Sequence, residues 1–275
     1  MFFRANILYF VIERDIHRQY RKNKIIEKLK ADSLVTSLKI NSTDSIPVEI
    51  AAMCGADCIW LDMEHCAADY NEIGKQILAA KAHGAEVIVR TPRGAYSNLT
   101  RPLELDASGI MVPHVMGYED AKQVVYYSKF HPVGRRPIDG GNADGKYGLL
   151  SMEDYIRYSN EEKLTIIQIE DVEAFEEIEK IATLDGIDML FFGPADFSQS
   201  IGMPTQIGNP RTLEAKRKVA QIARAHGKFA GTVGDPSNLK ELYDMGYRFV
   251  NLGADVDGLC MYFADLLEQV KKTDL

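Results

Sequence analysis

The chain has 275 residues, of which 46% are hydrophobic and 26% are charged, and its formal net charge at pH 7 is −8. This length accommodates one large α/β domain or two small ones, and this composition is typical of a globular protein. The negative net charge argues against general nucleic-acid binding, which requires a basic surface.

The stretch at residues 1–12 is apolar, but Arg4 and Asn6 interrupt it. It is shorter than the roughly 20 apolar residues that span a bilayer, and no small-residue cleavage site follows it. We therefore expect residues 1–20 to be an extension that packs on the main domain, at residues 21–275, or on a neighbouring subunit. No membrane partner is expected.

The cysteine spacing indicates neither a disulfide framework nor a zinc site. Cys54, Cys58, Cys66 and Cys260 form no CxxC pair. The grouping of the first three with His65 matches no common zinc module. Reduced thiols in a cytoplasmic protein are the expectation.

After a basic amphipathic segment at residues 21–30, short apolar segments alternate with segments whose apolar residues recur every three or four positions. The short apolar segments predict strands at residues 34–40, 58–62, 86–90, 109–112, 165–170, 189–192, 229–232 and 249–252. The other segments predict helices at residues 45–54, 70–83, 98–105, 118–130, 171–181, 210–225, 236–245 and 255–271.

Eight strands in strict alternation with helices predict a single-domain α/β protein, a (β/α)8 TIM barrel. A doubly wound parallel sheet is the alternative. Such sheets usually carry a glycine-rich phosphate-binding motif, and neither GxGxxG nor GxxxxGK[ST] occurs here. The barrel is therefore preferred.

Two acids follow neighbouring predicted strands. Glu170 comes at the end of the fifth strand, and Asp196 follows the sixth in the segment Gly193–Asp196. Because parallel strands place their carboxyl ends side by side, both carboxylates should face the barrel mouth. Carboxylate oxygens with open positions beside them suit a hard divalent cation. The alternative is two unrelated surface acids that cap helices.

Other charged residues lie near strand ends. Asp62, Glu64 and His65 follow the second strand, and Arg90 closes the third. His65 beside two acids resembles an oriented general base, although a structural histidine is the alternative. Asp106, just before the fourth strand, could support the catalytic groups or cap a helix. The role of His114, after Pro113, stays open.

Residues 132–150 contain five glycines and precede the fifth strand. A glycine-rich loop of this length inside a compact domain is usually functional or disordered. We expect a lid over the barrel mouth, with disordered filler as the alternative.

Four segments, taken in their order and spacing, resemble the HpcH/HpaI family: Asp62–His65, Val89–Arg90, Gln168–Glu170 and Gly193–Ser198. The resemblance covers residues 21–270. It implies a pyruvate-type (β/α)8 barrel that is a class II, metal-dependent aldolase, related to the citrate lyase beta chain. The implied substrates are 4-hydroxy-2-oxo acids or 2-keto-3-deoxy sugar acids, cleaved to pyruvate and an aldehyde. It also implies homohexamers, as trimers of dimers, that exchange the last helix between subunits.

The resemblance also implies residue roles. Glu170 and Asp196 would bind Mg²⁺, Mn²⁺ or Co²⁺. Arg90 would hold the pyruvyl keto oxygen and stabilise the enolate. His65 would accept a proton, and Asp106 would raise its basicity.

Substrate contacts are implied for Gln168 and for the Gly193–Asp196 segment, namely Gly193, Pro194, the backbone amide of Ala195, and Asp196. Asp62 and Glu64 would support these groups. Cys66 and Pro137 depart from the family pattern, where glycine is usual at both positions. These departures concern the aldehyde side of the pocket more than the metal side.

Two other functions stay open: a lyase of the citrate-lyase-beta or malyl-CoA type, and an inactive barrel that binds a ligand. A Schiff-base aldolase would need a lysine at a strand's carboxyl end. Lys39 is the one lysine within a predicted strand, and no neighbour in the sequence obviously poises it. We therefore expect no Schiff base.

Overall fold

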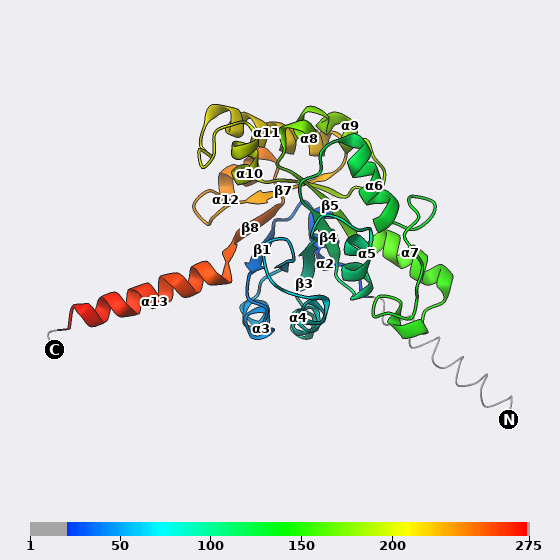
Figure 1. Cartoon of the computed structure of the whole chain (residues 1–275), viewed down its shortest axis with the longest axis horizontal. Coiled ribbons are helices and arrows are strands. Elements are labelled where there is room, and N and C mark those ends of the chain that lie inside the picture. Colours follow the sequence, from blue (N-terminus) through cyan, green and yellow to red (C-terminus); the bar gives the residue numbers. More distant parts are fainter. Residues whose placement is uncertain (1–20, 274–275) are drawn as a thin grey trace, which may run out of the picture.

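The computed structural model describes residues 21–273, so the predicted extension at residues 1–20 lies outside the described part. Eight parallel strands form a closed barrel in which each strand pairs with the next and β8 pairs with β1 (Figure 1). This confirms the (β/α)8 prediction and excludes the doubly wound sheet. The strands are β1 (Val35–Ile40), β2 (Cys58–Asp62), β3 (Glu86–Arg90), β4 (Gly109–Val112), β5 (Leu164–Ile169), β6 (Met189–Phe192), β7 (Phe229–Val233) and β8 (Phe249–Ala254).

The predicted helices are present, with one split in two. They are α3 (Ile46–Met53), α4 (Tyr70–Ala82), α5 (Ser97–Glu104), α6 (Tyr118–Ser128), α8 (Val172–Glu176), α9 (Ile178–Ala182), α11 (Pro210–Ala225), α12 (Leu239–Met245) and α13 (Asp255–Lys271). Three further segments were not predicted: α7 (Met152–Glu162), the short 3-10 helix η1 (Lys146–Gly148) and α10 (Pro194–Ser200). None of the helices in the described part of the chain is both long and apolar enough to cross a bilayer.

The basic amphipathic segment forms α2 (Lys24–Lys30), which covers one end of the barrel. Asn23 caps its first turn by accepting hydrogen bonds from two backbone amides. Ile25, Ile26 and Leu29 are buried and join the cluster that fills the barrel interior. Burial of three aliphatic side chains favours docking by roughly 1.5–3 kcal/mol each. The amino-terminal end of the barrel is thereby closed, which leaves the carboxyl end as the mouth.

The glycine-rich segment at residues 132–150 does not cover the mouth of its own barrel, so the lid prediction is wrong. Arg136 and Asp144 form a fully buried ion pair of 2.7 Å. The Asp144 amide donates to the Glu104 carbonyl in the last turn of α5. Because each helix runs antiparallel to the strands, that turn lies at the amino-terminal end of the barrel.

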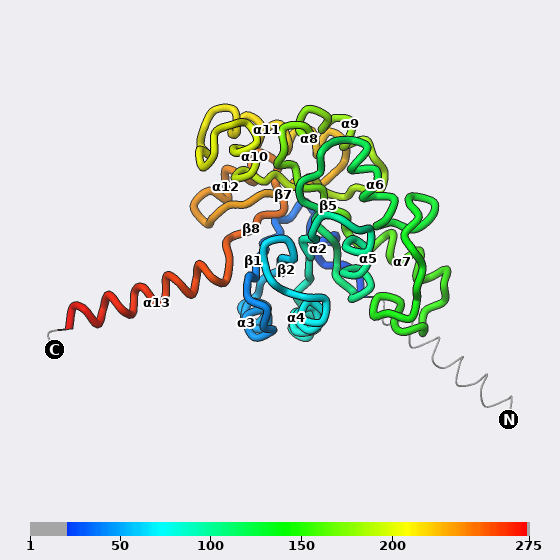
Figure 2. The backbone as a smooth tube through the Cα atoms, in the orientation of Figure 1, coloured from blue at the N-terminus to red at the C-terminus, as the bar shows by residue number. Residues whose placement is uncertain are grey.

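The last helix, α13, projects away from the barrel (Figures 1 and 2) and contains no buried residue. Met261, Phe263 and Leu267 are each more than half exposed. The carboxylate of Asp255 anchors its start by accepting from the Asn41 amide at 2.7 Å. Such an apolar helix, unpacked within the described residues of its own chain, is suited to a protein–protein contact.

Candidate active site

A buried arginine forms the fixed centre of the barrel mouth. The carboxylate of Asp62 accepts from Arg90 Nε at 2.9 Å and from its Nη2 at 2.6 Å, a bidentate pair. The third guanidinium nitrogen, Nη1, lies 3.1 Å from Glu64 Oε2. The guanidinium also stacks on the Trp60 ring, 5.0 Å from the ring centroid. Arg90 is therefore held on three sides before any substrate arrives.

The charges around this pair keep it ionised. Burial by itself raises the pKa of Asp62, but the hydrogen bonds and charges of Arg90 and Lys39 outweigh burial and hold the pKa well below its usual range. Burial opposes the charge on Arg90, yet Asp62 and the nearby Glu64 and Glu170 raise its pKa. A fixed positive charge in a site shielded from water can stabilise developing negative charge strongly.

Glu170 lies at the end of β5 with both carboxylate oxygens engaged. Gln168 donates its side-chain amide to one oxygen, and the backbone amide of His114 donates to the other at 2.8 Å. Glu170 is 1% exposed. Gly193 passes so close that a Cβ there would lie 2.6 Å from Glu170 Oε2. The Gly193–Asp196 segment thus needs glycine at its first position for reasons of space.

The environment of Glu170 lacks a sufficient cation. Burial raises its pKa to about 7, and the charges of Asp196 and Glu64 add to the rise, although the His114 amide and its charge oppose it. The Asp196 carboxylate, half-buried in the first turn of α10, has no hydrogen bond or ion pair within residues 21–273. The buried side-chain oxygen of Gln168, Oε1, has no hydrogen-bond partner within these residues either. Oxygen atoms that lack hydrogen-bond and ion-pair partners are suitable ligands for a hard divalent cation.

A second grouping at the same place was not predicted. His114, Glu170 and Asp171 each offer a ligand atom within 4.8 Å of the others. His114 Nδ1 lies 2.9 Å from Asp171 Oδ2, and its backbone φ is +47°, an unusual value for a histidine. His114 follows β4 and Asp171 follows β5, so the strand-end criterion used for the other residues would have found both.

His65 lies at the mouth but is not held in a fixed orientation. Its side chain is 57% exposed, and Nε2 lies 3.5 Å from Glu64 Oε2. That distance is too long for a strong hydrogen bond. Its partner is nevertheless Glu64, one of the two acids that the sequence analysis placed beside it.

Asp106 does not lie beside His65 within one barrel, so its support of that residue stays a prediction. Asp106 precedes β4 and therefore lies at the amino-terminal end of the strand, opposite to the mouth. Its carboxylate contacts the ammonium groups of Lys81, Lys146 and Lys163. A residue at that end cannot act on a group at the mouth of the same barrel.

The mouth therefore combines a buried, preorganised cation with a pair of oxygen donors that lack a counter-ion. A fixed guanidinium of this kind can stabilise negative charge that develops on an oxygen beside it.

Comparison with known proteins is consistent with this arrangement. A model of the HpcH/HpaI aldolase/citrate lyase family matches residues 37–261. A 2-keto-3-deoxy-L-rhamnonate aldolase of Klebsiella pneumoniae is 32% identical over 220 residues, which cover 79% of this chain and 82% of that protein.

Among solved structures, an HpcH/HpaI aldolase from Desulfitobacterium hafniense superposes with a TM-score of 0.85 at 28% identity, covering 92% of this chain and 98% of that one. The citrate synthase SbnG superposes with a TM-score of 0.82 at 27% identity, covering 90% of this chain and 96% of that one.

Proposed function

This chain belongs to the HpcH/HpaI aldolase/citrate lyase family, and we propose that it is a divalent-metal-dependent pyruvate aldolase. Its reaction is the reversible cleavage of a 2-keto-3-deoxy sugar acid, or another 4-hydroxy-2-oxo acid, to pyruvate and an aldehyde. The observation that carries the proposal is the buried Arg90–Asp62 pair beside Glu170, whose pKa is raised to about 7. The named activity of the Klebsiella relative supports a keto-deoxy sugar acid as the substrate.

Glu170 and Asp196 hold the ion in this proposal, and Mg²⁺, Mn²⁺ or Co²⁺ are the candidates because all their donors are oxygens. The chemistry that the ion supplies when bound is polarisation of the 2-oxo group. Supporting observations are the unpartnered Asp196 carboxylate and Gln168 carbonyl, described above for the part of the chain within residues 21–273.

Arg90 acts on the charge that develops during cleavage. Breaking the C3–C4 bond leaves the electron pair on C3, and the resulting enolate places negative charge on the oxygen at C2. Asp62 and Glu64 fix the guanidinium, so its remaining N–H groups can donate to that oxygen without reorganisation.

His65 removes the proton from the C4 hydroxyl, which becomes the aldehyde oxygen. Glu64 is an acid beside it in the same chain. Gln168 and the backbone amide of Ala195 contact the pyruvyl part of the substrate. Ala195 lies in the first turn of α10 after Gly193 and Pro194, where backbone amides have no partner within the helix.

A pyruvate-release assay over a panel of 2-keto-3-deoxy acids and 4-hydroxy-2-oxo acids tests the proposal. We expect release that stops after exhaustive chelation and returns with Mn²⁺ or Mg²⁺. Release of pyruvate that survives chelation would contradict the metal assignment. Cleavage confined to citrate or malyl-CoA would favour the citrate-lyase type, and no turnover of any compound would favour an inactive barrel.

We also propose a homo-oligomer, a hexamer built as a trimer of dimers, in which α13 packs on a neighbouring subunit. Support comes from its exposed apolar side chains and from a second apolar strip on α3, where Ile46, Ile50 and Met53 are each more than half exposed. Light scattering should give a hexamer, and Phe263→Asp should dissociate it. A monomeric wild type would refute the packing of α13 on a neighbouring subunit.

A further inference from the structure

Lys39 places a second positive charge beside Arg90, at the carboxyl end of β1. Four positions before it, Val35 belongs to the cluster that fills the barrel interior, and so does Trp60, which pairs with Lys39 in register. Because side chains alternate between the two faces of a strand, Lys39 points to the barrel axis as well. Its side chain is 18% exposed, and Nζ lies 5.8 Å from the centroid of the Trp60 ring on which Arg90 also stacks.

The pairing of β1 with β8 is irregular beside Lys39. Ser37 pairs with Asn251 and Lys39 pairs with Ala254, so two steps along β1 correspond to three steps along β8. Gly253, within the longer segment, has a φ of +137°, a backbone conformation that favours glycine. Bulges of this kind are frequent next to active sites, where they redirect side chains. The barrel therefore departs from regular pairing where Lys39 enters the mouth.

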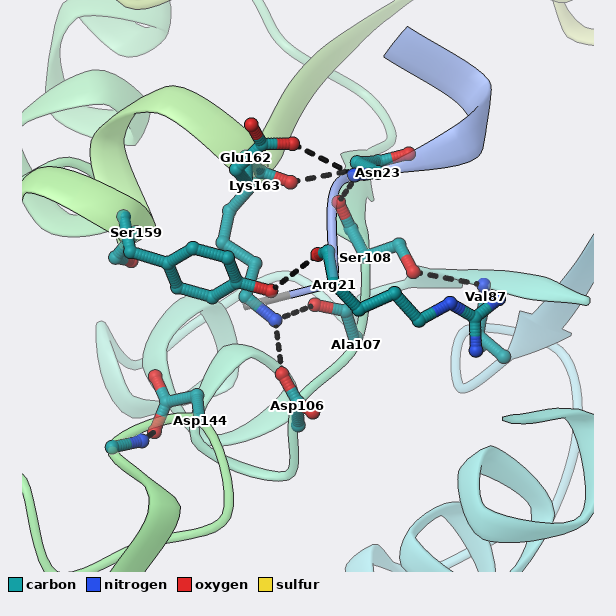
Figure 3. Close-up of polar contacts among 12 residues, drawn as sticks. Arg21, Asn23, Val87, Asp106, Ala107, Ser108, Asp144, Ser159, Glu162 and Lys163 are labelled. Carbon is teal, nitrogen blue, oxygen red and sulfur yellow. Dashed lines mark hydrogen bonds and ion pairs between the residues drawn. The ribbon is translucent and has the colours of Figure 1, made fainter. Parts of the chain in front are cut away.

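Lys39 and Arg90 share one carboxylate oxygen. Lys39 Nζ lies 2.8 Å from Asp62 Oδ2, and Arg90 Nη2 donates to the same oxygen at 2.6 Å. Lys163 and Asp106 form another buried lysine–aspartate pair, at the amino-terminal end of the barrel (Figure 3). The pair at the mouth differs in that its aspartate also holds an arginine.

The acids around Arg90 outnumber it. Its guanidinium contacts Asp62 through two nitrogens and Glu64 through the third. One positive charge that faces two negative ones gives a negative sum, which would oppose the development of an enolate nearby. Adding the charge of Lys39 brings the sum to zero. These groups are largely buried, so water screens their interactions poorly.

The other charged groups at the mouth do not replace Lys39. Glu170 also acts on Arg90, but its counter-charge is the divalent ion of the proposed function. The rings of His65 and His114 lie 3.5 Å from Glu64, farther than the guanidinium does. Within the described part of the chain, Lys39 and Arg90 are the two cations whose charges act on the carboxylate between them.

We propose that Lys39 is a positioning residue of the aldolase reaction, which shares Asp62 with Arg90 and thereby keeps the charge of Arg90 available to the enolate oxygen. This inference rests on the proposed function, in which Arg90 acts on that oxygen. If Asp62 bound Arg90 alone, it would cancel much of the charge that it holds in place. With Lys39 on the same oxygen, Asp62 still fixes the guanidinium but neutralises it less.

Two substitutions separate the charge of Lys39 from its hydrogen bond to Asp62. Lys39→Gln keeps an N–H donor and removes the charge, whereas Lys39→Arg keeps both. We expect kcat for pyruvate release to fall about 10-fold in Lys39→Gln and to return close to the wild-type value in Lys39→Arg, with KM changed little. The loss should be smaller than that for removing an oxyanion donor itself, because Lys39 acts through Asp62.

Lys240→Gln is the matched control, because Lys240 forms a 2.7 Å ion pair with Asp244 on the surface of α12 and its side chain is 84% exposed. This variant should keep the wild-type kcat. Circular dichroism checks that each variant is folded, and Lys39→Met takes the place of Lys39→Gln if the latter does not fold.

Binding of oxalate gives a readout that does not depend on turnover. Oxalate carries a second negative charge where the enolate oxygen develops it, whereas pyruvate has a neutral keto oxygen there. Calorimetric titration in the presence of Mn²⁺ should show the dissociation constant of oxalate rising about 10-fold in Lys39→Gln, and that of pyruvate rising less. Equal changes for the two ligands would assign Lys39 to ground-state binding and overturn the proposal.

The aldehyde half of the substrate distinguishes this role from direct contact with the substrate. Every substrate of the panel yields the same pyruvate enolate, so the loss in Lys39→Gln should be similar for all of them. A loss confined to one kind of aldehyde would place Lys39 in the aldehyde pocket and overturn the proposal. A wild-type kcat in Lys39→Gln, or an equal loss in Lys39→Arg, would overturn it too. A wild type that releases no pyruvate would refute the proposed function itself, and this inference with it.

Discussion

Two buried carboxylates, at opposite ends of the same barrel, have opposite acid–base properties. Glu170 at the mouth is surrounded by amide donors and other acids, and burial raises its pKa to about 7. Burial acts in the same direction on Asp106 at the amino-terminal end. The charges of Lys163, Lys81 and Lys146 outweigh it there and hold the pKa of Asp106 far below its usual range.

Both acids are buried, but their pKa values shift in opposite directions. The charges and hydrogen-bond donors around a buried acid, rather than its burial alone, therefore decide the direction of its pKa shift. Asp106 contacts three lysine ammonium groups, which keep it ionised. Glu170 accepts hydrogen bonds from two amides instead, and burial outweighs them. Substitutions at the mouth test this contrast and the chemistry that depends on it.

The largest effect is expected when the acids at the mouth lose their charge. Glu170→Gln and Asp196→Asn should each reduce metal-dependent pyruvate release by more than about 10²-fold. Loss of a residue that only hydrogen-bonds to a metal ligand costs about 10- to 100-fold in affinity or activity, and loss of a ligand itself should cost more. Initial rates at saturating Mn²⁺ measure this. Glu173→Gln, an exposed acid on α8, is the control and should keep full activity. Near-normal rates in Glu170→Gln would remove that residue from the metal site.

Arg90→Lys should lower kcat by on the order of 10²-fold, although the charge is kept. A lysine ammonium cannot reproduce the planar fork that binds Asp62 and still donates to the enolate oxygen. Steady-state kinetics with the best substrate of the panel measures the loss. A variant with near-normal kcat and a raised KM would assign Arg90 to substrate binding alone.

Gly193→Ala should weaken Mn²⁺ binding by about 10-fold, since the new Cβ would lie 2.6 Å from Glu170 Oε2 and displace that carboxylate. Titration calorimetry gives the affinity. Gly208→Ala, where the added Cβ has open space, is the matched control. Equal affinities in the two variants would show that Glu170 can move without loss.

The metal-free protein should lose stability as the pH rises from about 4.5 to about 7. The folded protein keeps a proton on Glu170 over this range while the unfolded chain releases it, so the folded state binds more protons. The loss is on the order of 3 kcal/mol, and it should be absent in Glu170→Gln. Urea denaturation of chelated protein at several pH values measures it. A wild-type profile identical to that of Glu170→Gln would contradict the raised pKa.

No effect is expected from borohydride in the presence of pyruvate. Lys39 Nζ lies 2.8 Å from the Asp62 carboxylate, so its ammonium group serves the Arg90–Asp62 pair. Mass spectrometry should find no adduct, and activity should persist. A trapped pyruvyl adduct on Lys39 would indicate Schiff-base chemistry.

The fold and the mouth were largely predictable because buried parallel strands leave a clear sequence pattern. All eight predicted strands lie within two residues of the observed ones. Charged residues after such strands then had to lie at one end. Glu170 and Arg90 were found in this way.

The errors arose where that rule was not applied strictly. Asp106 comes before its strand, and the glycine-rich segment follows the end of α6, so both belong to the opposite end of the barrel. Asp171 obeys the rule and was passed over, and the role of His114 was left open. The three-lysine cluster joins residues that are 82 positions apart in the chain, from Lys81 to Lys163, and no local pattern reveals it.

Proton release on metal binding tests most directly whether Glu170 awaits a cation. Mn²⁺ should be titrated below pH 7 in two buffers of different ionisation enthalpy, whose comparison gives the number of protons released. We predict release of close to one proton per ion in the wild type and none in Glu170→Gln, because the ion must displace the proton that Glu170 holds. Tight binding of Mn²⁺ with equal proton release in both proteins would contradict the account.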